Sequence, residues 1–269
     1  MKSSIDQLTT SQGNQIAYSI EGDGPWLTLS HSLASNMQMW NPQMPLLTKH
    51  FKVLRFDTRG HGLSSAPSDP YTLDDLALDA YALFQALGIE RTHWLGLSMG
   101  GMIGQTLILQ YPQLFHSLVL ADTTSKRPEN AKQMWGARIA KAKSEGMSAM
   151  VDSTLERWFE HDFREAHPAI MQEIAQGIAS TSVNGFAGCC EAISHINTFE
   201  RLHEITCPTL IMVGERDHGT PPPMAKAMKE KMPDATFFEI PNAGHISNVE
   251  QAAIFNQHLI EFYQRHHFL

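Results

Sequence analysis

The sequence has few cysteines, no excess of basic residues and no long apolar run, and each of these absences excludes a class of protein. Its three cysteines are odd in number and two are adjacent, which predicts free thiols in a reducing cytoplasm rather than a disulfide framework. The formal net charge is −8, whereas binding nucleic acid needs a basic face. No segment has the roughly 18 consecutive apolar residues of a membrane span, and residues 1–20 contain no continuous apolar stretch that would indicate a secretory signal. We therefore expect neither nucleic acid nor a membrane as a partner.

What is present indicates one globular α/β protein. The chain has 269 residues, of which 42% are hydrophobic and 18% charged, and it is long enough for one core with an inserted subdomain. Several short apolar runs are bounded by Gly, Pro or Asp, as is typical of strands buried on both faces of a parallel sheet. These runs are Trp26–Ser30, Lys52–Phe56, Trp94–Leu97, Ser117–Ala121, Thr209–Val213 and Thr236–Ile240.

Helical patterns separate these runs. Thr72 and Asp75 have the spacing of a capping box at the start of an apolar stripe, which Gly88 is expected to end. Further helices are predicted over Gly100–Gln110 and Val249–Tyr263. Strands that alternate with helices predict a mostly parallel sheet covered by helices on both sides.

Residues 125–196 break this alternation. They contain helical patterns, such as Ala131–Lys143 and Ala149–Phe159, and no convincing strand. Because the segment follows one strand and precedes another, it is predicted to be a helical lid above the sheet. Residues 1–124 and 197–269 would then form the core.

A candidate nucleophile lies between a predicted strand and a predicted helix. Gly96-Leu97-Ser98-Met99-Gly100 matches G-x-S-x-G, the nucleophile elbow, in which a strained turn exposes the serine hydroxyl. A serine hydroxyl needs a base, and the chain order of this architecture is serine, acid, histidine. Asp217 and His245 each follow a late strand, so Ser98, Asp217 and His245 are predicted to form a catalytic triad.

Other residues could take parts of this role. Asp122 follows the strand after the elbow helix and is an alternative acid, and Glu215 is a second. His61 is expected to brace a turn, and His218 to be either a pocket residue or exposed. Two backbone N–H groups should form the oxyanion hole, that of Met99 directly after the nucleophile and that of Leu33 in the loop after an early strand.

These motifs resemble those of the α/β-hydrolase superfamily over nearly the whole chain, and more specifically they are similar to 3-oxoadipate enol-lactonases. The resemblance rests on the loops around Ser98, Asp217 and His245 and on several further segments. These are His31-Ser32-Leu33, residues 57–64, residues 96–105, Trp135, Arg138-Ile139, Arg157-Trp158-Phe159, residues 185–193 and residues 220–224. Ala34 departs from the family, in which Gly is common at that position.

The resemblance implies hydrolysis of a small enol-lactone that carries a carboxylate, in the catabolism of aromatic acids, without a metal or organic cofactor. No closely spaced Cys/His pattern indicates zinc either. An anionic substrate needs a local cation, and Trp135 and Arg138 share a face of a predicted lid helix. Arg138 could bind the carboxylate and Trp135 could wall the ring. Arg157 and Trp158 are adjacent on a helix, so at most one of them is expected to face the pocket.

Other functions use the same scaffold. A general carboxylesterase, a cofactor-free haloperoxidase or perhydrolase, and a non-catalytic ligand receptor stay open, whereas enzymes of this fold with an aspartate nucleophile are excluded by Ser98. The expected partner is a small ester or lactone, and the sequence is compatible with a homo-oligomer.

Overall fold

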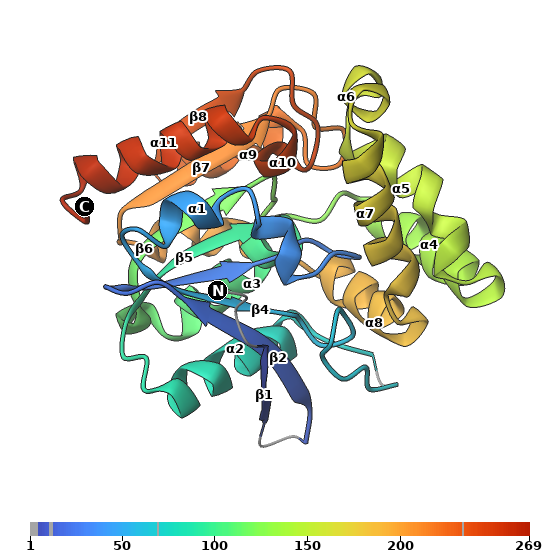
Figure 1. Cartoon of the computed structure of the whole chain (residues 1–269), viewed down its shortest axis with the longest axis horizontal. Coiled ribbons are helices and arrows are strands. Elements are labelled where there is room, and N and C mark those ends of the chain that lie inside the picture. Colours follow the sequence, from blue (N-terminus) through green and yellow to red (C-terminus); the bar gives the residue numbers. More distant parts are fainter. Residues whose placement is uncertain (1–4, 11–12, 69, 233) are drawn as a thin grey trace.

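One eight-stranded sheet organises the molecule, and its strand order is β1-β2-β4-β3-β5-β6-β7-β8 (Figure 1). The computed structural model describes residues 5–10, 13–68, 70–232 and 234–269. The strands β3 to β8 pair in parallel, whereas β1 and β2 are antiparallel to their neighbours. The bounds are β1 Asp6–Thr9, β2 Gln15–Glu21, β3 Trp26–Ser30, β4 Lys52–Phe56, β5 Thr92–Leu97, β6 Phe115–Ala121, β7 Thr209–Gly214 and β8 Thr236–Ile240.

The mostly parallel sheet predicted from the apolar runs is confirmed. All six predicted strands are present, and β5 and β7 are buried at every position, as expected of central strands covered on both faces. The apolar runs did not reveal β1 and β2. Both lie at one end of the sheet and carry several exposed or half-buried polar residues, so they lack the continuous apolar signal of the central strands.

Helices cover both faces of the sheet, with α1 and α11 on one face and α2, α3 and α9 on the other (Figure 1). Thr72 caps α2 through the expected capping box with Asp75, and Gly88 ends that helix in a left-handed conformation at φ 65°. The helices outside the insertion are η1 Met37–Trp40, α1 Met44–Leu47, α2 Leu73–Leu87, α3 Met99–Gln110, η2 Pro112–Leu114, η4 Phe199–Glu204, α9 Pro222–Lys231, α10 Ser247–Glu250 and α11 Ala252–Arg265.

The prediction of one continuous C-terminal helix over Val249–Tyr263 is wrong. Gln251, at φ −125° and ψ 50°, leaves the helical region and separates the short helix α10 from α11. The break lets the Glu250 side chain turn back toward residues 160 and 244, where its oxygens accept two backbone hydrogen bonds. The spacing of apolar residues along the sequence does not reveal a helix break of this kind, because the break accompanies a tertiary contact.

Helices make up the regular structure of residues 131–194, between β6 and η4. They are α4 Ala131–Glu145, η3 Met147–Met150, α5 Val151–Trp158, α6 His161–Ala166, α7 Pro168–Ser180 and α8 Val183–Ser194. An antiparallel bridge between Lys126 and Asn197 lies where the chain leaves and re-enters the core. These helices stand together at one end of the sheet, beside the loops that follow β3, β5 and β7 (Figure 1).

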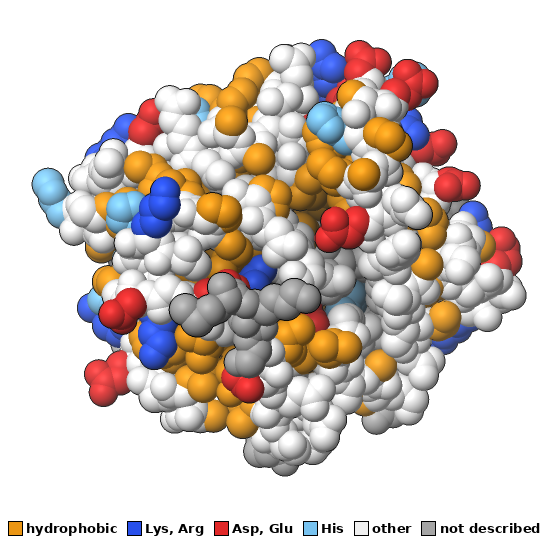
Figure 2. All heavy atoms as spheres, viewed as in Figure 1, with side chains coloured by type: hydrophobic (Ala, Val, Ile, Leu, Met, Phe, Trp, Pro, Cys, Tyr) orange, Lys and Arg blue, Asp and Glu red, His pale blue; other side chains and the backbone are white. Residues whose placement is uncertain are grey.

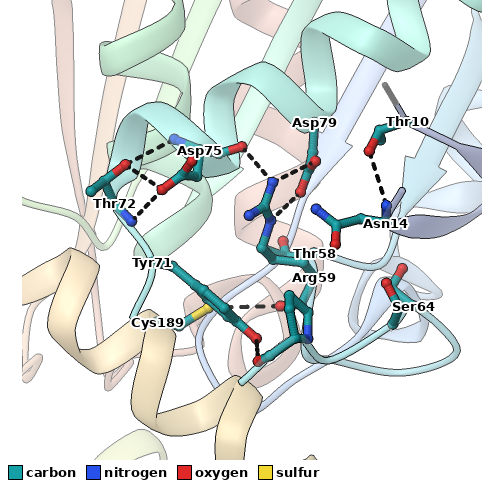
Figure 3. Close-up of polar contacts among 12 residues, drawn as sticks. Thr10, Asn14, Thr58, Arg59, Ser64, Tyr71, Thr72, Asp75, Asp79 and Cys189 are labelled. Carbon is teal, nitrogen blue, oxygen red and sulfur yellow. Dashed lines mark hydrogen bonds and ion pairs between the residues drawn. The ribbon is translucent and has the colours of Figure 1, made fainter. Parts of the chain in front are cut away.

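The loop after β4 contacts both the core helix α2 and the helix α8 of this segment. The Arg59 guanidinium forms a two-pronged ion pair with Asp79 of α2, with N···O distances of 2.5 and 2.7 Å (Figure 3). Gly60 and Gly185 of α8 approach so closely that a Cβ on either would lie 2.2 Å from the other's Cα. Two glycines therefore allow α8 to rest directly on this loop.

Two other expectations concern the cysteines and membranes. All three cysteines are free, as expected; Cys189 and Cys190 are buried, and Cys207 is half-buried. Among the helices of the described ranges, none is long and apolar enough to cross a bilayer.

Candidate active site

Ser98 occupies the sharp turn between β5 and α3. Its backbone lies at φ 55° and ψ −114°, a conformation that non-glycine residues rarely adopt. The flanking glycines make the turn sterically feasible, because a Cβ on Gly96 would lie 2.2 Å from the Gly100 carbonyl oxygen and one on Gly100 2.0 Å from that of Ser30. The G-x-S-x-G pattern thus reflects close packing of α3 against β3 and β5, and the turn presents the Ser98 hydroxyl at the end of the sheet.

Ser98, His245 and Asp217 form one chain of hydrogen bonds. The Nε2 atom of His245 lies 2.9 Å from Ser98 Oγ, and its Nδ1 atom lies 2.8 Å from Asp217 Oδ2. All three side chains are buried, yet Ser98 and His245 border a cavity. This arrangement can move a proton from the hydroxyl to the imidazole while the carboxylate orients the ring.

The Asp217 carboxylate has further donors that keep it ionised. The backbone N–H groups of Gly219 and Thr220 donate to Oδ1 at 2.7 and 3.0 Å, and the Thr220 hydroxyl donates to Oδ2 at 2.7 Å. Burial alone would raise the pKa of Asp217. The charge and hydrogen bond of His245, together with the Thr220 donors, outweigh burial and lower that pKa below its usual value.

Asp122 lies close to this chain but does not contact His245. The Gly214 N–H donates to its Oδ1 atom at 2.7 Å, and the Ser247 hydroxyl bonds Oδ2 at 2.5 Å. Complete burial and the nearby Asp217 charge raise the pKa of Asp122 well above its usual value. Of the three acids considered from the sequence, Asp217 therefore pairs with the histidine, Asp122 links the ends of β6 and β7, and Glu215 accepts the Asn242 N–H at 2.9 Å.

Two buried histidines hold the loop that contains Leu33. His61 Nε2 accepts the Ala34 N–H at 2.9 Å, and His31 Nε2 accepts the Thr58 N–H at 3.0 Å. Burial lowers the pKa of His31 to about 4 and that of His61 to about 3, so both rings are neutral acceptors at neutral pH. His61 braces this loop, as expected. Ala34 adopts φ 58°, which explains why glycine would suit this position.

This loop and the start of α3 lie beside Ser98. Leu33 borders the same cavity as Ser98, and Met99 is the first residue of α3, where helix N–H groups have no partner within the helix. Leu33 and Met99 thus lie close to the nucleophile, and the role of their N–H groups as an oxyanion hole stays a prediction.

The cavity above Ser98 has a volume of about 100 Å³. Of the residues predicted for the site, it brings together Ser98, His245, Leu33, Trp135 and Arg138, with Asp217 behind His245. The other lining residues are Ser32, Met102, Met134, Arg157, Trp158, Ile193, His218, Gly219 and Thr220. His218 is thus a pocket residue.

Two arginines make one part of this cavity cationic. The Arg138 guanidinium lies over the rings of Trp135 and Phe186, 5.1 and 5.5 Å from their centroids. Arg157 also lines the cavity, and burial lowers its pKa, although the guanidinium remains charged at neutral pH. Among the residues that the structure describes, no carboxylate forms an ion pair with either arginine.

The expectation that at most one of Arg157 and Trp158 faces the cavity is wrong. Both line it, because they form the last turn of α5, directly before the chain becomes extended at Phe159. The cavity surrounds this helix end, so two neighbouring side chains reach it from different sides. The resemblance to the enol-lactonases includes Arg157-Trp158-Phe159 and so pointed to both residues as part of the site. Helical spacing indicated the opposite, because adjacent side chains on a helix point in different directions.

Within the described part of the chain, no group of three or more His, Cys, Asp or Glu side chains could hold a metal ion.

Comparisons with known proteins agree with this geometry. Residues 25–252 match the model of the alpha/beta hydrolase fold family. The chain is 35% identical to 3-oxoadipate enol-lactonase 2 of Acinetobacter baylyi, covering 94% of each chain. It is 30% identical to a putative carbamate hydrolase of Variovorax paradoxus, covering 92% of this chain and 96% of the relative. The crystal structure of the enol-lactonase of Burkholderia xenovorans superposes with a TM-score of 0.93 at 34% identity, covering 96% of this chain and all of the other. The chain therefore belongs to the alpha/beta hydrolase fold family and is an enzyme of the carboxylic ester hydrolase class.

Proposed function

We propose that the protein hydrolyses a small, carboxylate-bearing enol-lactone, such as 3-oxoadipate enol-lactone, through an acyl-enzyme on Ser98. The observation that carries this proposal is a small cavity in which the Ser98–His245–Asp217 chain faces two arginines, neither of which forms an ion pair with a carboxylate of the described residues. The identity to two curated enol-lactonases, at 35% and 32%, supports the same substrate class.

The chemistry follows from the contacts of Ser98. His245 Nε2 takes the hydroxyl proton as Oγ attacks the lactone carbonyl. The Leu33 and Met99 N–H groups stabilise the oxyanion of the tetrahedral intermediate. The ring C–O bond then breaks, the enol oxygen receives the proton from His245, and the acyl group remains on Ser98. A water molecule activated by His245 releases it as a carboxylate, with Asp217 stabilising the charged imidazole in both steps.

Arg157 and Arg138 together would bind the substrate carboxylate. Burial disfavours the charged form of the Arg157 guanidinium, the Asp217 charge offsets this in part, and a substrate carboxylate that enters the cavity would offset it further. The chain has a net charge of −8, so local cations are needed to attract an anion. Trp135 holds the Arg138 guanidinium against its ring face and thereby limits where that group can lie.

We infer further that residues 125–196 act as a lid, and that the enzyme serves the catabolism of aromatic acids in the cytoplasm. The supporting observation is that α4, α5 and α8 contribute lining residues to the cavity, so a substrate must pass these helices to reach Ser98.

The first test compares kcat/KM for 3-oxoadipate enol-lactone with that for p-nitrophenyl acetate. We expect about 10⁵–10⁷ M⁻¹s⁻¹ for the lactone and a much smaller value for the ester. The reverse order would favour a general carboxylesterase. The apolar side chains of Met102, Met134 and Ile193, which could hold a neutral acyl group, favour that second candidate.

The second test addresses the cations. Arg157→Ala and Arg138→Ala should each raise KM for the lactone about 10- to 100-fold, the usual worth of a hydrogen bond to a charged group, and should change p-nitrophenyl acetate hydrolysis little. Arg201→Ala is the control, because its guanidinium pairs with Glu204 and does not line the cavity. Equal losses on both substrates would remove the arginines from substrate recognition.

A further inference from the structure

A second and larger hollow adjoins the catalytic cavity. This outer groove has a volume of about 480 Å³ and lies between α7, with Ile174 and Gly177, and the segment around η1, with Met39 and Pro42. Figure 2 shows this face of the molecule, where hydrophobic side chains gather in the hollow between the core and the helices of the insertion. Nothing in the hydrolytic chemistry described above uses the outer groove.

The wall between the two hollows is only one residue thick. Leu33 lines the catalytic cavity, and the next residue, Ala34, lines the outer groove. In the same way, His245 lines the catalytic cavity and Ile246 lines the outer groove. Trp158 lines both hollows. Of the described residues that line either hollow, Trp158 is the one shared by both, so its side chain is placed to form part of the wall between them.

The backbone of Trp158 is fixed to the loop of His245. The Trp158 carbonyl accepts the Ile246 N–H at 3.3 Å. Glu250 ties the two segments a second time, since its carboxylate accepts the Gly244 N–H at 2.6 Å and the Glu160 N–H at 2.9 Å. The indole packs edge-on against Phe159, with centroids 6.4 Å apart, and the residue is only 6% exposed. Its position is thus set by contacts that do not depend on substrate.

We propose that Trp158 is the specificity-determining residue that closes the catalytic cavity against the outer groove, and that the groove accepts the aliphatic chain of an ester when the indole is removed. With Trp158 in place, the substrate is confined to the smaller of the two hollows, which favours a small acid or lactone. Without it, an alkyl chain attached near Ser98 continues into an apolar groove several times larger. This inference rests on the proposed chemistry at Ser98 but not on the enol-lactone.

The experiment measures a chain-length ratio, which is kcat/KM for p-nitrophenyl octanoate divided by that for p-nitrophenyl butanoate. Each methylene removed from water is worth roughly fourfold in kcat/KM, so the four added methylenes allow a large change. The ratio should be below one in the wild type. Trp158→Ala should raise it at least about tenfold, and Trp158→Leu serves if the alanine variant does not fold.

A second substitution fills the groove from its opposite wall. A Cβ on Gly177 would lie 3.5 Å from Asn36 Nδ2, an ordinary contact, so a side chain fits there and extends into the groove. Gly177→Leu in the Trp158→Ala background should return the ratio to near the wild-type value while butanoate hydrolysis stays that of Trp158→Ala. Gly177→Leu alone should leave the wild-type ratio unchanged.

Two results would overturn the inference: an unchanged ratio in a folded Trp158 variant, or a raised ratio that survives Gly177→Leu. Failure of the proposed function is seen separately, because Ser98→Ala would then still hydrolyse butanoate, or the wild type would hydrolyse esters and not the lactone.

Discussion

The two buried aspartates at the ends of β6 and β7 allow a sharp test of which acid serves His245. Asp217 accepts from His245 Nδ1 at 2.8 Å, whereas the Asp122 carboxyl group is hydrogen-bonded to the Gly214 N–H and to the hydroxyl and N–H of Ser247. In Asp217→Asn, the amide NH₂ would face Nδ1 and favour the wrong imidazole tautomer. Activity should fall about 10⁴-fold, the loss known for this change in a serine triad.

Asp122→Asn should behave differently, because the raised pKa of Asp122 means that its carboxyl is readily kept neutral. An asparagine amide can accept from the Gly214 N–H and donate to Ser247 Oγ, and so replaces a neutral carboxyl at two of its partners. We expect kcat/KM for p-nitrophenyl acetate to fall less than about tenfold, which corresponds to about 1.4 kcal/mol of transition-state stabilisation.

The stability of the same variant has a definite sign with pH. A carboxyl whose folded pKa is raised binds its proton more tightly in the native state, so its contribution to stability is full below the unfolded pKa and is lost as pH rises toward the folded pKa. Asp217, whose pKa is lowered, has the opposite sign and loses stability as pH falls through its folded pKa. The Asp122→Asn variant should therefore gain in melting temperature, relative to the wild type, as pH rises from 4 to 8.

Thermal unfolding of both proteins across that pH range, with p-nitrophenyl acetate kinetics beside it, tests this reasoning. A melting-temperature difference that does not change with pH would mean that Asp122 is ionised in the folded protein. A loss of activity as large as that of Asp217→Asn would mean that Asp122 acts on His245.

Three further changes test other parts of the site. Ser98→Ala should abolish covalent labelling by a fluorophosphonate, and labelling that persists would refute Ser98 as the nucleophile. Gly185→Ala places a Cβ 2.2 Å from the Gly60 backbone and should lower the free energy of unfolding by about 1–3 kcal/mol; the matched control, Gly136→Ala, has open space and should be neutral or stabilise by up to about 1 kcal/mol. Ala34→Gly removes the cost of φ 58° and should change stability by less than about 1 kcal/mol, toward greater stability, in denaturant unfolding; a clear destabilisation would show that the Ala34 methyl contributes packing that outweighs the strain.

The parts of the fold that the sequence predicted are those dictated by local chemistry. Strands covered by helices on both faces form short apolar runs, so β3 and β4 inside the sheet, and β8 at its edge, begin and end at the predicted residues. The capping box and Gly88 fixed both ends of α2 for the same reason. The edge strand β1 and its neighbour β2 were missed because both carry exposed or half-buried polar residues. The break at Gln251 was missed because it accompanies a contact of Glu250 with distant backbone.

The residues of the candidate site also fall into those that local sequence patterns predicted and those that depend on tertiary packing. Ser98, Asp217 and His245 were placed from a steric motif and a fixed chain order, since their geometry is set by the ends of β5, β7 and β8. Arg157 had no such signal. Its role depends on how the end of α5 meets the cavity, which is a matter of packing between the insertion and the core.

The same distinction explains why the chemistry and the selectivity of this enzyme should change independently. The hydrogen-bonded chain from Ser98 to Asp217 is held by backbone donors of residues 219 and 220 and by sheet ends that a single substitution in the insertion does not move. Part of the cavity wall comes instead from α4, α5 and α8, and there Arg138 of α4 and Arg157 and Trp158 of α5 line the space. A substitution at one of these three positions alters the charge or the length of the space above Ser98 while the proton path stays in place. Substrate preference should therefore follow the side chains of α4 and α5, and the reaction itself should follow the ends of the strands.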